Sequence, residues 1–177
     1  LADSSSFPHE PLFMNWAGGD FHLQSNSPCI NSGNNTYLTN HIFFAVLTND
    51  FNGNPRLIGS LVDVGAYEFS SPTSILPYSW LWRYELAMDG SADAADADGD
   101  GMSNYAEWRA GTNPTNAASV VTVQLPVVTQ TNATITWQSV SGVRYFVQST
   151  PDLFAQPFTS IASNIPAFSS TTSYTDT

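Results

Sequence analysis

Lysine is absent from the sequence, and four arginines stand against 15 aspartate and glutamate residues, so the 177-residue chain carries a formal net charge of −11. A chain with so few cations cannot neutralise phosphates, and nucleic acid is therefore not an expected partner. The same charge disfavours an anionic membrane surface. The acid excess is typical of secreted proteins in salty or calcium-containing water, and it predicts an extracellular or cell-surface location.

Cysteine occurs once, at Cys29, so an intrachain disulfide is excluded. We expect this side chain to be a small buried hydrophobe, because no recognisable pattern pairs it with a histidine. No apolar run approaches the roughly 18 residues that a membrane-spanning helix needs, so no membrane insertion is expected in this segment. No signal peptide is present, which indicates a mature product or a fragment.

What the sequence does contain is an acidic stretch, residues 96–107, with the pattern of a twelve-residue calcium loop. Aspartates alternate at its positions 1, 3 and 5, Gly101 at position 6 permits a sharp turn, and a glutamate fills position 12. Ca²⁺ prefers about six to eight oxygen ligands. The expected ligands are Asp96, Asp98, Asp100, the backbone carbonyl of Met102, Asn104 and Glu107.

The alternative interpretation of this stretch is an acidic, flexible linker, since Asp, Gly and Ala are also common in loops. Four carboxylates within twelve residues repel one another, however, so an ordered loop of this composition needs a cation. Mg²⁺ demands octahedral geometry and keeps its waters, which makes Ca²⁺ the expected cofactor.

Residues 1–69 alternate short apolar segments with turns rich in Asn, Ser, Gly and Pro. Strands are predicted at 21–24, 42–47 and 61–69, in a pattern that suits a sandwich, a barrel or a β-solenoid. The sequences SPCINSG (27–33), GNPR (53–56) and VDVGAYE (62–68) resemble the closing segment of bacterial right-handed parallel β-helix proteins of the pectate-lyase-like kind. That family usually has Asp at the position of Asn31.

The resemblance implies that residues 1–69 are terminal coils of a parallel β-helix. Proteins of this family are secreted or surface-exposed, and many are implicated in polysaccharide binding, polysaccharide cleavage or adhesion. Each coil of a β-helix buries its apolar side chains on the next, so several coils are needed for stability. We therefore expect a longer solenoid to precede this segment, or another chain to cover its open end.

Residues 70–119 are predicted to form a helix, the calcium loop and a second helix. Pro77 can open the first helix, and the second is expected at 103–110, ending at Gly111. The apolar face of the first helix would carry Trp80, Leu81, Tyr84 and Met88. We expect the two Trp-bearing helices to pack together, with the metal supplying much of the folding free energy.

The sequence DADGDGMSNYAEWRAGTNPTN (96–116) resembles the dockerin-like and thrombospondin type 3-like calcium repeats of bacterial surface proteins. The resemblance implies an EF-hand-like loop. Asn113 stands where the pattern usually has Asp. True dockerins carry two such repeats, and the single loop here argues against docking to a cohesin.

Residues 120–177 alternate polar and apolar residues, which predicts strands at 121–125, 134–139, 145–149, 158–162 and 172–175. This spacing suggests a β-sandwich. The passage 133–176 resembles a fibronectin type III-like module, which implies that Trp137 lies in its core and faces Tyr145 and Val147. About five strands are predicted where that fold uses seven, so we expect an incomplete sandwich.

No constellation in these residues predicts catalysis, and an enzymatic region upstream stays open. Asp63 and Glu68 could form an acid/base pair, but on a strand they would point to opposite faces. Pairing of one of them with Arg56 is the expected alternative. No phosphate loop, zinc pattern, nucleophile elbow or dinucleotide fingerprint is present.

The sequence thus predicts a mainly β chain of three parts: β-helix coils at 1–69, a dockerin-like calcium spacer at 70–119 and an incomplete sandwich at 120–177. Its predicted function is structural or adhesive, with calcium rigidifying the junction between β-rich modules. Two alternatives stay open: the accessory C-terminal part of a polysaccharide lyase or hydrolase, and a subunit of an extracellular filament assembled by strand addition. The expected partners are a polysaccharide, another surface protein or further copies of the chain.

Overall fold

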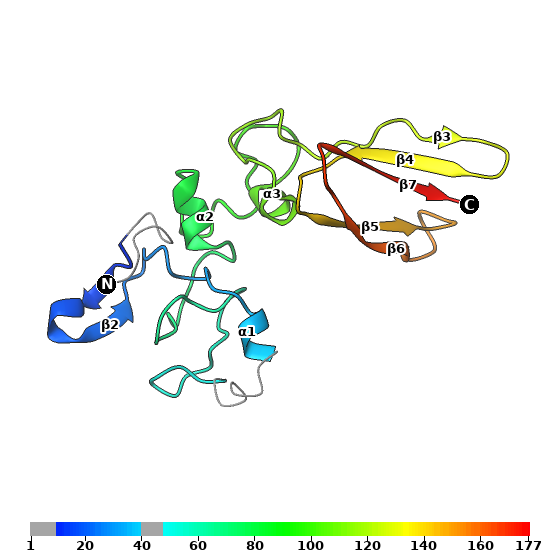
Figure 1. Cartoon of the computed structure of the whole chain (residues 1–177). Helices are drawn as coiled ribbons and strands as arrows, with labels where there is room; N and C mark the ends of the chain where they lie inside the picture. Colours follow the sequence, from blue (N-terminus) through cyan, green and yellow to red (C-terminus); the bar gives the residue numbers. More distant parts are fainter. Residues whose placement is uncertain (1–9, 40–47) are drawn as a thin grey trace. The chain divides into compact units, whose positions relative to one another are not determined.

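The computed structural model describes residues 10–39 and 48–177, and within them the chain is mainly β with short helices. Its elements are β1 (Phe13–Asn15), the 3₁₀ helix η1 (Trp16–Gly18), β2 (Asp20–Leu23), α1 (Thr36–Thr39), α2 (Tyr78–Arg83), α3 (Asn104–Ala110), β3 (Val127–Val128), β4 (Ala133–Gln138), β5 (Arg144–Ser149), β6 (Thr159–Pro166) and β7 (Thr171–Asp176) (Figure 1). In the part of the chain that the structure describes, no helix has the length and apolar character needed to cross a membrane.

The chain divides into two compact units. Unit 1 comprises Leu1–Ala97 and Ser103–Tyr105, and unit 2 comprises Asp98–Met102 and Ala106–Thr177. The division therefore passes through the acidic stretch 96–107.

The first described element of unit 1 is an antiparallel hairpin, in which β1 pairs with β2 through Phe13↔Leu23 and Asn15↔Asp20. The turn between the strands is the helix η1, which ends at Gly18 and is followed by its C-cap residue, Gly19, with a φ of 84°. Because a left-handed φ costs glycine no Cβ clash, Gly19 can reverse the chain here. The strand predicted at 21–24 is confirmed in substance by β2.

Coils of a parallel β-helix are not shown among residues 10–39 and 48–69, where the named strands form a two-stranded antiparallel sheet. The strand predicted at 61–69 is wrong, because this segment is irregular. Several of its backbone donors bond to carboxylates: Asp63 N donates to both carboxylate oxygens of Glu68, at 3.2 and 3.1 Å, and Phe69 N donates to Asp63 Oδ2 at 2.6 Å. Val62 N donates to Asn35 Oδ1 and Val64 N to Cys29 O, both at 2.9 Å. The strand predicted at 42–47 lies outside the described residues.

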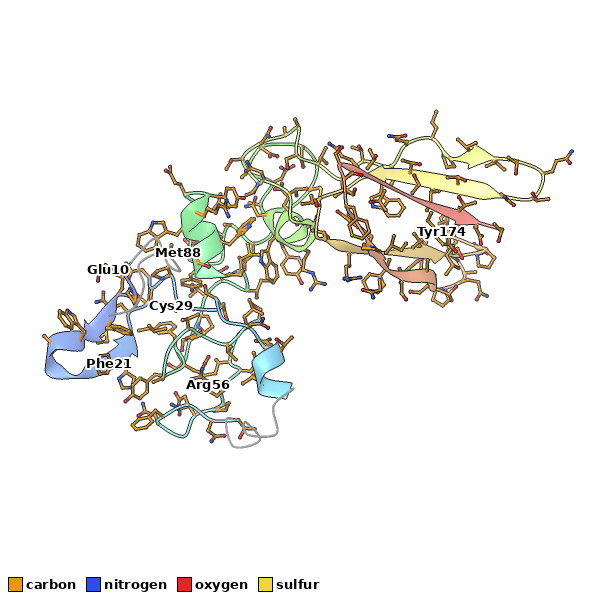
Figure 2. All side chains as sticks on the ribbon, in the orientation of Figure 1. Glu10, Phe21, Cys29, Arg56, Met88 and Tyr174 are labelled. Carbon is orange, nitrogen blue, oxygen red and sulfur yellow. The ribbon has the colours of Figure 1, made fainter. Side chains whose placement is uncertain are left out.

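The apolar core of unit 1 gathers side chains from separate segments of the sequence. Its buried members are Leu23, Cys29, Ile30, Val62, Leu76, Tyr78, Leu81 and Ala92. Cys29 is a free, buried thiol whose pKa is raised chiefly by that burial, so the prediction of a small buried hydrophobe is confirmed. Figure 2 labels this side chain and that of Arg56.

A buried carboxylate pair accompanies this core. Asp63 and Glu68 do not point to opposite faces, as a strand would require, because the Glu68 carboxylate folds back onto the Asp63 amide. Arg56 Nε lies 3.3 Å from Glu68 Oε1, which confirms the predicted pairing. Burial raises the pKa of Glu68 to about 7 despite this cation.

Helix α2 is shorter than the apolar pattern predicts. It begins after Pro77, as expected, but it ends at Arg83, so that Met88 lies outside it. The cause is Glu85, whose left-handed φ of 56° stops the helix. Glu85 N bonds to Trp82 O at 3.1 Å and Leu86 N to Leu81 O at 2.9 Å, the paired bonds of a Schellman C-terminus.

Unit 2 contains two small antiparallel sheets, β3–β4–β7 and β5–β6, which form two layers (Figure 1). The register of β4 on β7 is supported by hydroxyl pairs, Thr134 with Thr175 at 2.9 Å and Thr136 with Ser173 at 2.8 Å. Such cross-strand pairs stabilise one register over its neighbours. The residues of β4 that alternate with Thr134 and Thr136 lie on the opposite face of the strand, where they can pack inward.

Trp137 on β4 is that inward residue. It is 5% exposed, and its ring packs edge-on against Tyr145 of β5, with centroids 5.7 Å apart. Val147 is buried as well. The predicted strands at 134–139, 145–149, 158–162 and 172–175 are confirmed by β4 to β7, whereas 121–125 forms only an isolated bridge between Val123 and Trp137. The fibronectin type III-like topology stays a prediction.

Candidate calcium site

The acidic stretch curls because two glycines and two aspartates act together. Gly99 and Gly101 have φ values of 81° and 96°, which L side chains rarely adopt. Asp98 Oδ1 accepts a hydrogen bond from Asp100 N at 3.2 Å, and Asp100 Oδ1 accepts one from Met102 N at 2.7 Å. These side-chain turns orient alternate carboxylates toward the inside of the curl.

The result is a cluster of three carboxylates. Oxygens of Asp96, Asp98 and Asp100 all lie within 4.8 Å of one another. The structure thus brings together the first three predicted ligands. Glu107 is not part of that group, and Met102 takes part in the loop through its backbone N–H.

Three buried oxygens in this region accept no hydrogen bond: Asp98 Oδ2, Asp100 Oδ2 and Asn104 Oδ1. A buried polar atom without a partner costs about 1–3 kcal/mol, and more when it carries charge, so native proteins rarely retain one. Three such atoms from residues that share a metal-ligand pattern fit a hard cation. Carboxylate and amide oxygens are the donors that Ca²⁺ prefers.

Asn104, the first residue of α3, is fully buried. Its Nδ2 donates to Ala92 O at 2.8 Å, and its backbone N donates to Ala95 O at 2.7 Å. An amide nitrogen can donate to a carbonyl but an amide oxygen cannot, so the Ala92 bond fixes which end of the side chain remains for a cation. That end is Oδ1.

Glu107, one turn further along α3, is also fully buried. Thr112 Oγ1 donates to Glu107 Oε1 at 3.2 Å. Thr112 reaches this position because α3 ends at Ala110, directly before Gly111, whose φ is 74°, and Thr112 N returns to Glu107 O at 3.0 Å. The predicted helix at 103–110 and its end at Gly111 are both confirmed.

Sequence reasoning missed the two partners that hold the predicted ligands, Thr112 and Ala92. Thr112 follows Glu107 by five residues, directly after the helix-ending glycine, and this spacing could have indicated it. Ala92 contributes a backbone carbonyl from a turn without periodic pattern, so no side-chain signal points to it.

Residues 96–117 match the family model described as the bacterial TSP3 repeat. The TSP3 repeat is a calcium-binding repeat of extracellular proteins, and here it carries the Asp96, Asp98 and Asp100 cluster. The match includes every predicted ligand and the whole of α3. No curated protein and no solved structure matches the chain.

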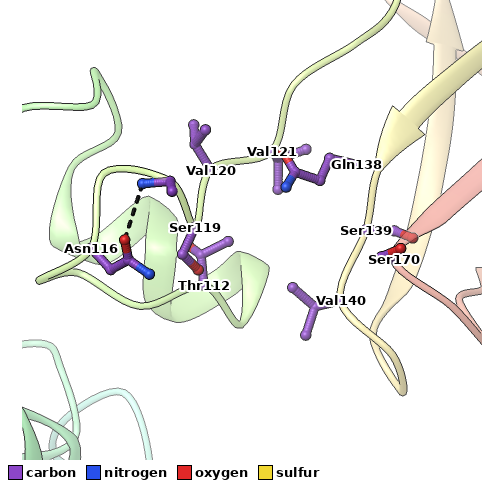
Figure 3. A pocket seen from close by; sticks show the side chains of 10 residues that line it. Thr112, Asn116, Ser119, Val120, Val121, Gln138, Ser139, Val140 and Ser170 are labelled. Carbon is purple, nitrogen blue, oxygen red and sulfur yellow. Dashed lines mark hydrogen bonds between the residues drawn. The ribbon is translucent and has the colours of Figure 1, made fainter.

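Unit 2 also contains an open pocket of about 280 Å³ (Figure 3). It is lined by valines and by polar residues such as Asn116, Gln138, Ser139 and Ser170, and by no carboxylate, histidine or cysteine. Asn116 Oδ1 is occupied by Ala118 N at 3.2 Å. The pocket therefore offers neither the charge nor the donor set of a metal site.

Proposed function

We propose that this chain is a calcium-binding structural segment of an extracellular multi-module protein. In this proposal the TSP3 repeat binds one Ca²⁺ through the six predicted ligands, and the ion rigidifies the junction between the β-rich parts. The observation that carries the proposal is the set of buried oxygens of Asp98, Asp100 and Asn104 that accept no hydrogen bond.

The boundary between the two units falls within residues 96–107, the proposed calcium loop. When bound, Ca²⁺ would supply the positive charge that offsets the repulsion among the carboxylates.

The residues of the chain itself prepare the site for the ion. Gly99 and Gly101 allow the tight curl, and the side-chain turns of Asp98 and Asp100 fix their carboxylates before a cation arrives. The Ala92 carbonyl and the Thr112 hydroxyl hold the other two ligands. A site prepared in this way binds with a smaller entropy cost than a flexible acidic linker.

The binding part of the proposal is tested by calorimetric titration of the chelator-stripped protein. Asp98→Asn and Asp100→Asn should each weaken Ca²⁺ binding by at least tenfold, because each removes a charge from the cluster. Asp152→Asn is the matched control, since Asp152 also accepts a bond from the amide two residues on, but from an exposed turn. Equal effects in all three variants would contradict the site.

The junction part is tested by ¹⁵N relaxation. Backbone amides of β2 and β4 should report one rotational correlation time with Ca²⁺ and two different times in EDTA. A single unchanged time in both conditions would contradict a rigidifying role while leaving binding intact.

One observation favours a second candidate function, strand addition between chains. Among the described strands β5 pairs with β6 alone, so one edge of each is open. Phe146 on β5 is 65% exposed and Phe158, which precedes β6, is 55% exposed. Open edges with apolar side chains are templates for a further strand.

Light scattering tests this candidate. Wild-type protein should form concentration-dependent oligomers, and Phe146→Lys should abolish them, because a charge on an edge strand opposes pairing. A wild-type monomer at all concentrations would exclude self-assembly through this edge. The proposals that residues 1–69 close a longer β-helix, and that a polysaccharide or surface protein is the partner, rest on the sequence motifs alone.

A further inference from the structure

Three residues before the calcium loop, Asp93 fastens two segments of unit 1 to each other. Ser74 Oγ donates to Asp93 Oδ1 at 2.5 Å, and Ile75 N donates to Asp93 Oδ2 at 3.0 Å. Ser74 is 2% exposed and Asp93 is half-buried, so their bond is partly shielded from water. A charged acceptor with two donors is among the stronger hydrogen-bonded arrangements in proteins. Segment 73–76 is thereby tied to the turn 90–95.

The turn 90–95 also holds the first residues of α3. Asn104 N donates to Ala95 O at 2.7 Å, Asn104 Nδ2 to Ala92 O at 2.8 Å and Tyr105 N to Asp93 O at 3.1 Å. These three bonds, donated by Asn104 and Tyr105, mean that the turn 90–95 fixes the position of Asn104, and that the helix which Asn104 begins does not. A shift of the turn would therefore move the Asn104 amide and with it the oxygen that is left for a cation.

The opposite end of this chain of contacts reaches the buried carboxylate network. Ser74 O accepts a bond from Asn31 Nδ2 at 3.0 Å, and Asn31 N donates to Asp63 Oδ1 at 2.8 Å. Asn31 and Asp63 are both buried. The hydrogen-bonded series lies within unit 1, to which Asn31, Asp63, Ser74, Ala92, Asp93, Ala95 and Asn104 all belong.

We infer that Asp93 and Ser74 are positioning residues for calcium, which couple the affinity of the TSP3 repeat to the order of segment 73–76. This inference rests on the proposed calcium site and goes beyond it, since neither residue is a ligand. Coupling of this kind is reciprocal: if segment 73–76 must be in place for Asn104 to bind the ion, the ion also holds the segment in place. Removing a residue that holds a metal ligand in place typically lowers metal affinity by about 10–100-fold.

The wild-type protein provides the first test, by amide hydrogen exchange. The amides of Ile75 and Leu76 donate to Asp93 Oδ2 and Ser74 Oγ. Their exchange should slow by at least tenfold in Ca²⁺ relative to the same concentration of Mg²⁺. Amides of β6 are the internal control and should not change. Ca²⁺ binding that leaves the Ile75 and Leu76 amides unaffected overturns the inference but not the calcium site.

The second test is a double-mutant cycle with Ser74→Ala, Asp93→Ala and the double variant. Each single variant should lower Ca²⁺ affinity by about tenfold or more, and the double variant should lose little beyond Asp93→Ala, because the two changes remove the same bond. Ser74→Ala is decisive, since it leaves the charge unchanged. Ser91→Ala, in the same turn but bonded to Asp89, is the control and should bind normally.

Unchanged affinity in Ser74→Ala, or losses that multiply in the double variant, overturn the inference. No Ca²⁺ binding by the wild type overturns the inference and the proposed function together. Far- and near-ultraviolet circular dichroism shows whether each variant is folded before titration, and the exchange experiment decides the question if Ser74→Ala does not fold.

Discussion

Thr112→Val tests how far the calcium site depends on a residue outside its ligand set. The substitution keeps the shape of the side chain nearly constant and removes the hydroxyl that donates to Glu107 Oε1. Both residues are buried, so the lost hydroxyl leaves Glu107 Oε1 away from bulk solvent. The Glu107 carboxylate would then be held by fewer bonds in the position that a cation requires.

The magnitude follows from the geometry. A hydrogen bond to a charged group contributes about 1.5–3 kcal/mol. The separation of 3.2 Å is longer than the usual range for a hydroxyl donor, which places this bond at the lower end. Since about 1.4 kcal/mol corresponds to a factor of ten, we expect Ca²⁺ affinity to fall about tenfold.

Calorimetric titration of Ca²⁺ into the chelator-stripped variant measures this change. Thr115→Val is the matched control, because Thr115 Oγ1 donates to Asn113 Oδ1 in an exposed turn three residues away. The control should bind like the wild type. A loss of less than twofold in Thr112→Val, or an equal loss in both variants, would refute the role given to Thr112.

The other predictions concern the loop, the unit 2 core and the buried carboxylates. Gly101→Ala should cost about 1–2 kcal/mol, because a left-handed φ strains an L residue, and it should weaken Ca²⁺ binding. Gly142→Ala is the control: it is strained in the same way but lies outside the loop, just before β5, so it should destabilise the protein without changing its Ca²⁺ affinity. Trp137→Ala should lower the free energy of unfolding by about 3–5 kcal/mol in a urea titration, and a loss no larger than that of the exposed Leu125→Ala would contradict a core role. Glu68 has a pKa raised from 4.5 to about 7 in the folded state, so its contribution to stability is complete below pH 4.5 and is lost as the pH rises through 7. Urea titrations at pH 5 and pH 8 should show this loss in the wild type and not in Glu68→Gln, and an equal pH dependence in both would contradict it.

The parts of the molecule that the sequence predicted are those set by local spacing. The Asp96, Asp98 and Asp100 cluster depends on alternation within one short loop, and the helix end at Gly111 depends on the residue that tolerates a left-handed φ. The strands of unit 2 were predicted from the alternation of polar and apolar residues. On β4, Thr134 and Thr136 form hydroxyl pairs on one face, and Trp137 lies on the other.

The parts that the sequence did not predict depend on bonds between distant residues or on exceptions to a local rule. The pattern at 61–69 indicated a strand, but Asp63 N and Phe69 N donate to the carboxylates of Glu68 and Asp63 rather than to a neighbouring strand. Helix α2 ends at Arg83 because Glu85, two residues on, is left-handed, and glutamate is a residue type that gives no warning of this conformation. The Ser74–Asp93 bond joins residues 19 positions apart, beyond the reach of any local pattern.

Thermal unfolding in Ca²⁺, in Mg²⁺ and in excess EDTA tests the central claim most directly. A ligand at about 100 times its dissociation constant stabilises the folded state by about 2.7 kcal/mol, so the account predicts a clear drop in melting temperature in EDTA. Ca²⁺ should restore the higher melting temperature, and an equal concentration of Mg²⁺ should not. The same melting temperature in all three conditions would contradict the account and leave residues 96–107 as an acidic linker.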